Sequence, residues 1–343
     1  MSDKIITLGI DVGKIWFHLV GLNEHGKSVY KKKVRREDLV ATVVAIAPPL
    51  VGMEACPGAQ YIARRLRELN VNAKMMAAQF VKPYLKSQKN DYNDAAAIAE
   101  AVTRPSMRFV PIKTQAQLDL QALHRYRDRL IADRIAATNQ IRAFLQENGI
   151  VLPKGKAALR DRLPTILEDE NQQLSGSLKH LISRIHQRWI EIESSISDAD
   201  KEIKQIAKTH PDCQRLTTIP GIGPLISTAI IAAIGNGSEF NNAREVAAWL
   251  GLVPRQYSTG GKAKLLGITK SGNPYLRKLL IHGARSVVIH SHRHQDRLSQ
   301  WLVQLECRVH RNKVVAALAN KLARIIWAVL RSDGVYQRIA IEA

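Results

Sequence analysis

The sequence predicts an α/β fold at the N-terminal end of the chain and an all-α, mostly helical fold after it. Three short apolar segments open the chain at residues 5–10, 15–22 and 28–34, and turn residues separate the last two. Helical and strand-like segments then alternate as far as residue 102, which is typical of a mixed sheet covered by helices. From about residue 115 the apolar spacing becomes helical.

The N-terminal elements follow one another closely. The first strand ends at Asp11 and begins an antiparallel meander, which turns at 23–26. The helix after the meander stops before Pro48 and Pro49, because proline cannot continue a helix. The apolar segment after these prolines predicts a strand that ends at Glu54. The helix, this strand, an amphipathic helix, a fifth strand and an alanine-rich helix are expected at 39–46, 50–53, 59–69, 71–76 and 91–102.

A long apolar stripe marks the middle of the chain. Between Leu174 and Ile206, apolar residues recur at spacings of three and four over more than four heptads, and a weaker stripe runs from Leu123 to Leu145. This period indicates a coiled coil or a long helical hairpin, whose role is to space two domains or to form a dimer. We therefore expect an α/β domain, a helical linker or dimerisation region and a C-terminal domain, at 1–112, 113–210 and 211–343.

Two loops stand out in the C-terminal region. The segment Thr-Ile-Pro-Gly-Ile-Gly precedes an apolar helix at 224–234, so Gly221 and Gly223 lie at a helix N-terminus, where free backbone N–H groups can bind phosphate. The segment resembles the turn of helix-hairpin-helix DNA-binding motifs, and a tight turn between packed helices fits it equally well. The polar segment at 256–273 indicates a long surface loop. Basic helices are expected after it, at 275–293 and 309–330.

The chain is strongly basic. It contains 51 Lys and Arg residues against 30 Asp and Glu residues, a formal net charge of +21, and residues 244–343 alone hold 17 basic and 5 acidic residues. Such a balance favours a polyanionic partner, most often nucleic acid. The basic side chains expected to contact nucleic acid are Arg255, Lys262, Lys264, Lys270 and Arg277.

Composition also disfavours several classes of protein. No apolar run approaches the roughly 20 residues of a membrane-spanning helix, and the first residues lack the apolar stretch of a signal peptide. The three cysteines lie far apart and form no Cys-x-x-Cys pair, which argues against a disulfide framework or a cysteine zinc site. We therefore expect a cytoplasmic protein without a membrane partner.

Four acidic residues stand where they can meet. Asp11 and Glu54 end two apolar strands, and Asp91 and Asp94 lie three apart at the start of a helix, on one of its faces. Carboxylates in such places can converge at one edge of a sheet and hold Mg²⁺. Two such ions stabilise both the attacking and the leaving oxygen of a phosphoryl displacement, and we expect one or two ions at this site. Taken singly, Asp91 and Asp94 also fit a helix cap and Glu54 a surface ion pair, whereas Asp11 ends an apolar strand, where an acid rarely lies without a partner.

Ordered short motifs run along nearly the whole chain. They are Gly9–Lys14, Met53–Ala59, Lys82–Tyr84 and Asn90–Ala95 in the N-terminal part, then Thr218–Gly223, Trp249–Pro254, Ser258–Lys262, Gly267–Asn273 and Leu276–Arg277. Each motif alone is weak, but their order and spacing together are specific. On these motifs the chain resembles the insertion-sequence 110 family of transposases, of the DEDD type.

The resemblance implies a fold and a chemistry. The N-terminal domain of the family is an RNase H-like, RuvC-type nuclease domain, and its four metal-binding acids map onto Asp11, Glu54, Asp91 and Asp94. The C-terminal transposase domain carries a serine nucleophile, which maps onto Ser258. Thr259 follows where many members have a second serine, so the register between the two positions stays open.

The resemblance also implies partners. Members of the family excise and insert mobile DNA, and some select donor and target DNA with a noncoding guide RNA, the bridge RNA, from the element's own end. Their assemblies are dimers and tetramers. A bacterial cytoplasmic protein associated with the nucleoid is the location that this activity implies.

Serine chemistry needs activation that the neighbouring residues can supply. A serine hydroxyl is a poor nucleophile unless a base, a metal or a positive field activates it. Basic residues surround Ser258 in the sequence, and Gly260 and Gly261 allow the backbone to approach a phosphate. Without the resemblance, a loop serine beside DNA-contacting lysines is the favoured explanation of Ser258.

Three other functions fit part of the sequence. A RuvC-like, metal-dependent junction nuclease without serine chemistry explains the acids but not the C-terminal half. A non-enzymatic DNA-binding protein explains the charge but leaves the four acids unexplained. The segment 9–13 also resembles the first phosphate loop of actin-like sugar kinases, whose second Asp-Gly-Gly loop is missing here.

Overall fold

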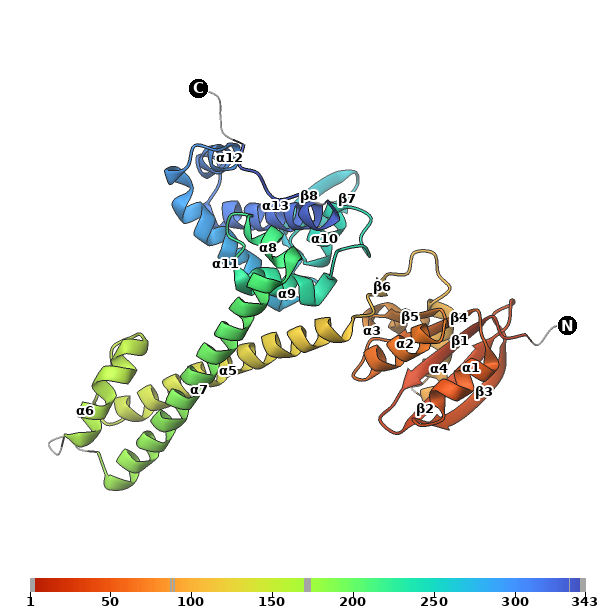
Figure 1. The fold of residues 1–343 in the computed structure, drawn as a ribbon, viewed down its shortest axis with the longest axis horizontal. Coiled ribbons are helices and arrows are strands. Elements are labelled where there is room, and N and C mark those ends of the chain that lie inside the picture. Colours follow the sequence, from red (N-terminus) through yellow and green to blue (C-terminus); the bar gives the residue numbers. More distant parts are fainter. Residues whose placement is uncertain (1–3, 87, 89, 170–173, 333, 340–343) are drawn as a thin grey trace. The chain divides into compact units, whose positions relative to one another are not determined.

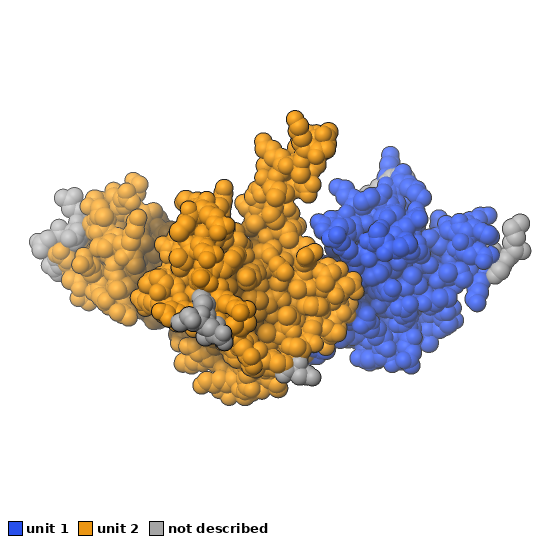
Figure 2. Space-filling model, turned by 90° about the horizontal axis from the view of Figure 1, so that it is seen from above, with its two compact units in different colours: residues 1–115 blue, residues 116–343 orange. Residues whose placement is uncertain are grey.

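The chain forms two compact units. The computed structural model describes residues 4–86, 88, 90–169, 174–332 and 334–339. Unit 1 comprises residues 1–115 and unit 2 residues 116–343, coloured blue and orange in Figure 2. Each has hydrophobic cores of its own. Within the described ranges, no helix combines the length and the apolar character needed to cross a membrane.

Unit 1 is built on a mixed six-stranded sheet (Figure 1). Its strands are β1 (Thr7–Val12), β2 (Trp16–Leu22), β3 (Ser28–Arg35), β4 (Leu50–Glu54), β5 (Ala73–Met76) and β6 (Phe109–Val110). They lie in the order β3-β2-β1-β4-β5-β6. The first three form an antiparallel meander, β4 is parallel to β1 and to β5, and β6 is antiparallel to β5. The predicted mixed α/β fold is confirmed.

Helices cover both faces of this sheet. They are α1 (Leu39–Ile46), α2 (Ala59–Glu68), α3 (Ala78–Val81), the 3₁₀ turn η1 (Lys82–Tyr84) and α4 (Asp91–Ala101). Buried side chains of α1 and α2 join Leu8, Ile10 and Phe17 in the core of one face. On the other face α4 packs against Val20 and Leu22 of β2. The alternation of side chains along each strand decides which residues face α4.

Two paired glycines bring α4 onto the sheet. Gly9 of β1 and Gly52 of β4 lie opposite each other in the parallel ladder. A Cβ atom on Gly9 would overlap the carbonyl oxygen of Ala95 and lie 2.6 Å from the amide nitrogen of Ala99. A Cβ atom on Gly52 would lie 2.9 Å from the Cβ atom of Val102. The helix backbone therefore rests on the sheet at a distance that only glycine permits.

Unit 2 is almost entirely helical. Its elements begin with α5 (Gln115–Gln146), the π-helical turn η2 (Ala158–Arg162), α6 (Leu163–Glu168), α7 (Gly176–Thr209), α8 (Pro211–Thr217), α9 (Pro224–Ile234) and α10 (Ala243–Trp249). They continue with β7 (Pro254–Thr259), β8 (Lys262–Ile268), α11 (Pro274–His290), the 3₁₀ turn η3 (Ser291–Arg293), α12 (Arg297–Glu306) and α13 (Arg311–Arg331). Buried side chains of α13 lie in the main core, and α8, α10, α11 and α12 pack around this helix.

The two long helices α5 and α7 run antiparallel. Arg134 of α5 contacts Glu193 of α7 at 2.8 Å, and further along the pair the indole nitrogen of Trp189 donates to the hydroxyl of Thr138 at 3.1 Å. Both contacts are partly buried, and Trp189 joins the small core at that end of the pair, where α6 also packs. Polar contacts therefore set the register between the two helices, while the apolar stripe forms the seam.

The segment expected to be a surface loop forms a β-hairpin instead. Strands β7 and β8 pair antiparallel, and Gly260 and Gly261 make a two-residue turn with φ of +55° and +75°. Such a turn requires positive φ at both positions, so a Gly-Gly pair suits it. The prediction of a loop over 256–273 was wrong because every residue of β7 and nearly all of β8 are exposed. A strand that buries neither face shows no apolar alternation.

Gly9→Ala tests the close contact between α4 and the sheet. The new methyl group must displace helix backbone rather than a flexible side chain, so we expect a loss of more than about 3 kcal/mol in the free energy of unfolding of unit 1. Chemical denaturation followed by circular dichroism measures it. Gly176→Ala is the matched control, since nothing lies within 4 Å of a Cβ atom there. Equal stability of the two variants would contradict the close packing.

A buried polar network anchors α5 in unit 2. His124 is only 3% exposed, and its Nδ1 and Nε2 atoms lie 3.0 Å from the hydroxyls of Tyr275 and Thr228. The Thr228 hydroxyl donates to the carbonyl oxygen of Pro224, so it accepts from Nε2–H, and Nδ1 accepts from Tyr275. Burial, helped by the charge of Arg127, lowers the pKa of His124 to about 4. The histidine is therefore neutral in the folded chain.

The low pKa of His124 makes stability depend on pH. The unfolded histidine binds a proton below about pH 6.5, whereas the folded one does so only near pH 4. This contribution is complete above pH 6.5 and is lost as the pH falls towards 4. We expect the unfolding free energy of His124→Gln to fall less steeply over this window than that of the wild type. Denaturation at several pH values measures both slopes, with exposed His25→Gln as control; identical slopes would refute the assignment.

Candidate functional site

The four acids of the sequence analysis lie around the first turn of α4. Asp11 stands two residues after Gly9 and Glu54 two residues after Gly52, so both side chains project from the sheet face that α4 covers. Asp91 and Asp94 belong to the first turn of α4. The side chain of Asn90 caps this helix by accepting from the amide of Tyr92 at 2.9 Å, which fixes where the helix starts.

The negative charges of the other three acids act on Asp11. Burial raises the pKa of Asp11 above its ordinary value, and the charges of Asp94, Asp91 and Glu54 raise the pKa further, while His18 lowers it. Repulsion between carboxylates is relieved when a cation binds among them. Ligand atoms of Asp11, His18 and Asp91 lie within 4.8 Å of one another, which fits one divalent ion.

His18 is a member of the cluster that the sequence analysis missed. It lies on β2 directly opposite Asp11 in the antiparallel ladder, and its Nδ1 atom is 3.4 Å from a carboxylate oxygen of Asp91. Its ring meets that of Tyr92 edge to face, with 4.9 Å between centroids. The only signal in the sequence was one polar residue within an apolar strand, and only the strand register shows that it faces Asp11.

Cys56 lies near the same acids. Its thiol approaches the carbonyl oxygen of Val12 at 3.9 Å. Burial raises the pKa of this thiol, and the charges of Glu54 and Asp11 raise it further. Cys56 therefore stays a thiol at neutral pH and is a poor nucleophile.

The β7–β8 hairpin of unit 2 presents two hydroxyl groups on opposite faces. Ser258 is exposed and pairs with Ala263, and its hydroxyl accepts from the side-chain nitrogen of Gln256 at 2.7 Å. Thr259, the alternative nucleophile, pairs with Lys262. Lys264 pairs with Tyr257, so both lysines lie on the Thr259 face rather than the Ser258 face. Arg255 is exposed at the start of the hairpin.

The remaining residues expected to bind nucleic acid fall into two groups. Lys270 is exposed just after the hairpin, and Gly223 lies at the start of α9 with open space around it. In contrast, Arg277 donates to the carbonyl oxygens of Leu250 and Ser271 at 3.0 and 2.7 Å, so it braces the loop before α11. Gly221 has a φ of +79° and packs against the backbone of Gly283, which accounts for the glycine by packing.

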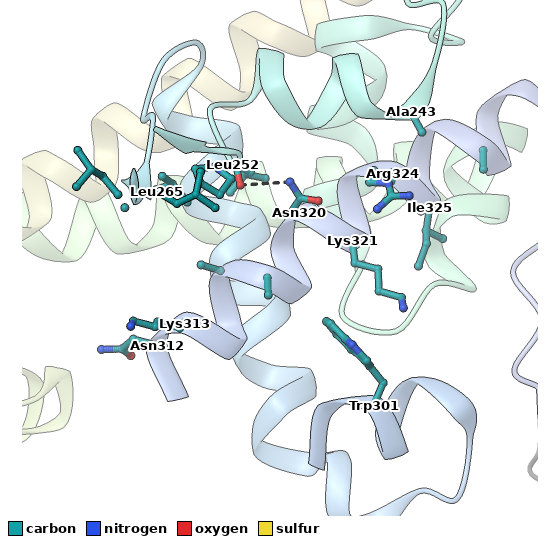
Figure 3. A pocket seen from close by; sticks show the side chains of 17 residues that line it. Ala243, Leu252, Leu265, Trp301, Asn312, Lys313, Asn320, Lys321, Arg324 and Ile325 are labelled. Carbon is teal, nitrogen blue, oxygen red and sulfur yellow. Dashed lines mark hydrogen bonds between the residues drawn. The ribbon is translucent and has the colours of Figure 1, made fainter. Parts of the chain in front are cut away.

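A groove of about 1240 Å³ lies beside the hairpin (Figure 3). Its floor is one face of α13, and Leu265 of β8 and Trp301 of α12 lie at its sides. Figure 3 shows Lys321 pointing towards the indole ring of Trp301, and its ammonium lies 4.4 Å from the ring centroid. Lys313 and Arg324 also line the groove, and none of the described lining residues is acidic. The groove thus combines apolar side chains with positive charge.

Comparisons with known proteins identify the family of the chain. A family model described as Transposase IS116/IS110/IS902 family matches residues 213–299, and a DEDD transposase model matches residues 8–149. The transposase for insertion sequence element IS1111A of Coxiella burnetii is 43% identical over 337 residues, covering 98% of this chain and 92% of that protein.

Two further relatives align over almost the whole chain. The transposase for insertion sequence element IS1328 of Yersinia enterocolitica is 40% identical over 335 residues, 98% of this chain and 99% of that protein. A probable family 20 transposase of Pseudomonas aeruginosa is 40% identical over 335 residues, 97% of this chain and 99% of that protein. The chain therefore belongs to the IS110/IS116/IS902 family of insertion-sequence transposases and is an enzyme of DNA transposition.

Proposed function

We propose that this transposase cuts and rejoins DNA with a Mg²⁺ site in unit 1 and a serine nucleophile in unit 2. The catalytic residues are the four acids of the cluster, Asp11, Glu54, Asp91 and Asp94, together with Ser258. The observation that carries the proposal is the convergence of the acids around the first turn of α4, which the raised pKa of Asp11 reflects. The mixed sheet with acids at the ends of β1 and β4 supports an RNase H-like, RuvC-type unit.

Asp11, Glu54, Asp91 and Asp94 would hold the metal through their carboxylate oxygens. When bound, Mg²⁺ supplies positive charge for the oxygens of the scissile phosphate. The close seating of α4 fixes the two helical carboxylates relative to the two strand carboxylates before substrate binds. Such preorganisation lowers the reorganisation needed during the reaction.

Ser258 would supply the oxygen that attacks the phosphate. A bond forms between its Oγ atom and phosphorus while the bond from phosphorus to the leaving strand oxygen breaks, and the hydroxyl proton ends on that oxygen through solvent. The side-chain amide of Gln256 donates to the same Oγ, which favours the alkoxide form. The covalent phosphoserine bond conserves the free energy of the phosphodiester bond that was broken. A second DNA strand can therefore be joined without ATP.

The substrates and partners follow from charge and exposed surface. The net charge of +21 supports binding of donor DNA, target DNA and a noncoding bridge RNA that guides the choice between sites. Lys262, Lys264, Lys270 and Arg255 are exposed for such contacts. Apolar side chains that are exposed on α5 and α7, among them Ile135 and Ile190, support a dimer or tetramer through these helices as a coiled coil.

A RuvC-like nuclease without serine chemistry is the second candidate. It is favoured by one observation, the separation of Ser258 from the lysines of its own hairpin, which lie on the opposite face. In this case the acids alone carry the reaction, with water as the nucleophile.

Covalent trapping separates these two functions. Purified protein, labelled donor and target DNA, RNA transcribed from the flanks of the element and Mg²⁺ are combined and resolved on denaturing gels. We expect a DNA–protein adduct in the wild type that is lost in Ser258→Ala and in Asp11→Asn but kept in Thr259→Val. Its loss without the RNA establishes guidance. Cleavage that survives Ser258→Ala and never forms an adduct would leave a metal-dependent nuclease.

The groove beside the hairpin gives a separate prediction about nucleic-acid contacts. If Lys321 binds a phosphate of the DNA, the Lys321→Gln variant has a shallower salt dependence of DNA binding. The slope of the logarithm of the binding constant against the logarithm of the salt concentration falls by about 0.7 to 0.9. Fluorescence anisotropy with labelled DNA at several salt concentrations measures it. Lys204→Gln, at an exposed position on α7, is the matched control and should leave the slope unchanged. Equal slopes for both variants would show that the DNA does not contact Lys321 in the groove.

A further inference from the structure

His18 occupies a place in the acid cluster that the four acids do not explain. It is 9% exposed, whereas the carboxylate that it contacts, Asp91, is 62% exposed at its side chain. A buried imidazole on the sheet thus touches an exposed carboxylate on the helix. Burial of a polar ring costs free energy unless it has partners, and the Nδ1 partner of His18 is Asp91.

An exposed aspartate in the first turn of a helix has several rotamers that point to solvent. For Asp91 to serve the same ion as Asp11, its carboxylate must be held towards the sheet. The Nδ1 contact at 3.4 Å does this, and the ring of Tyr92 supports the imidazole edge to face at 4.9 Å between centroids. The strand register then fixes His18 directly beside Asp11.

We propose that His18 is a positioning residue of the metal site, which holds the Asp91 carboxylate in ligand position by donating from Nδ1. The role rests on the proposed metal site. Mg²⁺ prefers oxygen ligands, and histidine supports such ligands from the second layer by hydrogen bonding to them. Because Nδ1 points at the carboxylate oxygen of Asp91, this nitrogen hydrogen-bonds to the metal ligand and does not coordinate the ion.

Mn²⁺ binding tests this role without relying on transposition. Mn²⁺ replaces Mg²⁺ as an ion that electron paramagnetic resonance detects, and titration of the full-length protein gives its affinity. We expect His18→Ala to weaken Mn²⁺ binding at least about 10-fold, as loss of a partner of a metal ligand commonly does. His18→Gln, whose amide can donate to Asp91, should recover most of the affinity. His25→Ala, at an exposed turn of the same unit, is the control.

The outcomes distinguish His18 from the metal site itself. Circular dichroism melting first establishes that each variant is folded. Unchanged Mn²⁺ affinity in His18→Ala overturns the positioning role while leaving the acid site intact. Pulsed resonance that detects a directly bound nitrogen in the wild type and not in His18→Gln also overturns it, because His18 is then a ligand. Wild-type binding no stronger than that of Asp11→Asn refutes the metal site and the role of His18 with it.

Discussion

The seating of α4 on the sheet through Gly9 and Gly52 is the contact on which the candidate site depends. Two adjacent strands each place a glycine beneath the helix, so the backbone of α4 above Gly9, and apolar side chains near its C-terminal end above Gly52, occupy the space that strand side chains would otherwise fill. Two residues further along each strand stand Asp11 and Glu54. The same geometry that removes two side chains therefore brings the helix's first turn within electrostatic reach of two carboxylates. The short distance between α4 and the sheet thus accounts both for the packing of this helix and for the grouping of the carboxylates.

Unit 2 uses glycine in a similar way to support its hairpin. A Cβ atom on Gly272 would overlap the carbonyl oxygen of Trp249, and one on Gly251 would overlap the backbone of Ser271. The segments on either side of the hairpin therefore cross in direct backbone contact, and the amide of Lys270 donates to Gly251 at 3.1 Å. Arg277 braces this crossing. The exposed strands project from a rigid base, which positions Ser258 without burying it.

Much of unit 1 could be predicted because its sequence carries local signals. Helix α1 covers the expected residues 39–46 because Pro48 and Pro49 end it. The strands are predictable because turn residues bound their apolar segments. The convergence of the acids could be expected from strand ends and a helix start. The hairpin could not, since neither of its faces is buried, and α12 was missed as a separate helix. His18 could not be predicted as a member of the cluster. Which residues lie opposite each other on neighbouring strands depends on the strand register, and a short segment of sequence does not determine that register. The functions of the acids and of Ser258 remain proposals.

The glycine contact also bears on how copies of a mobile element decay. Every single-base change that alters a glycine codon introduces a residue with a Cβ atom or a stop codon. At Gly9 each such residue must push against the backbone of α4. A copy that has drifted at this codon can retain all four acids and the serine in its reading frame and still have lost the geometry between them. Inheritance of an active element therefore requires that a position with no chemical group of its own remain unchanged.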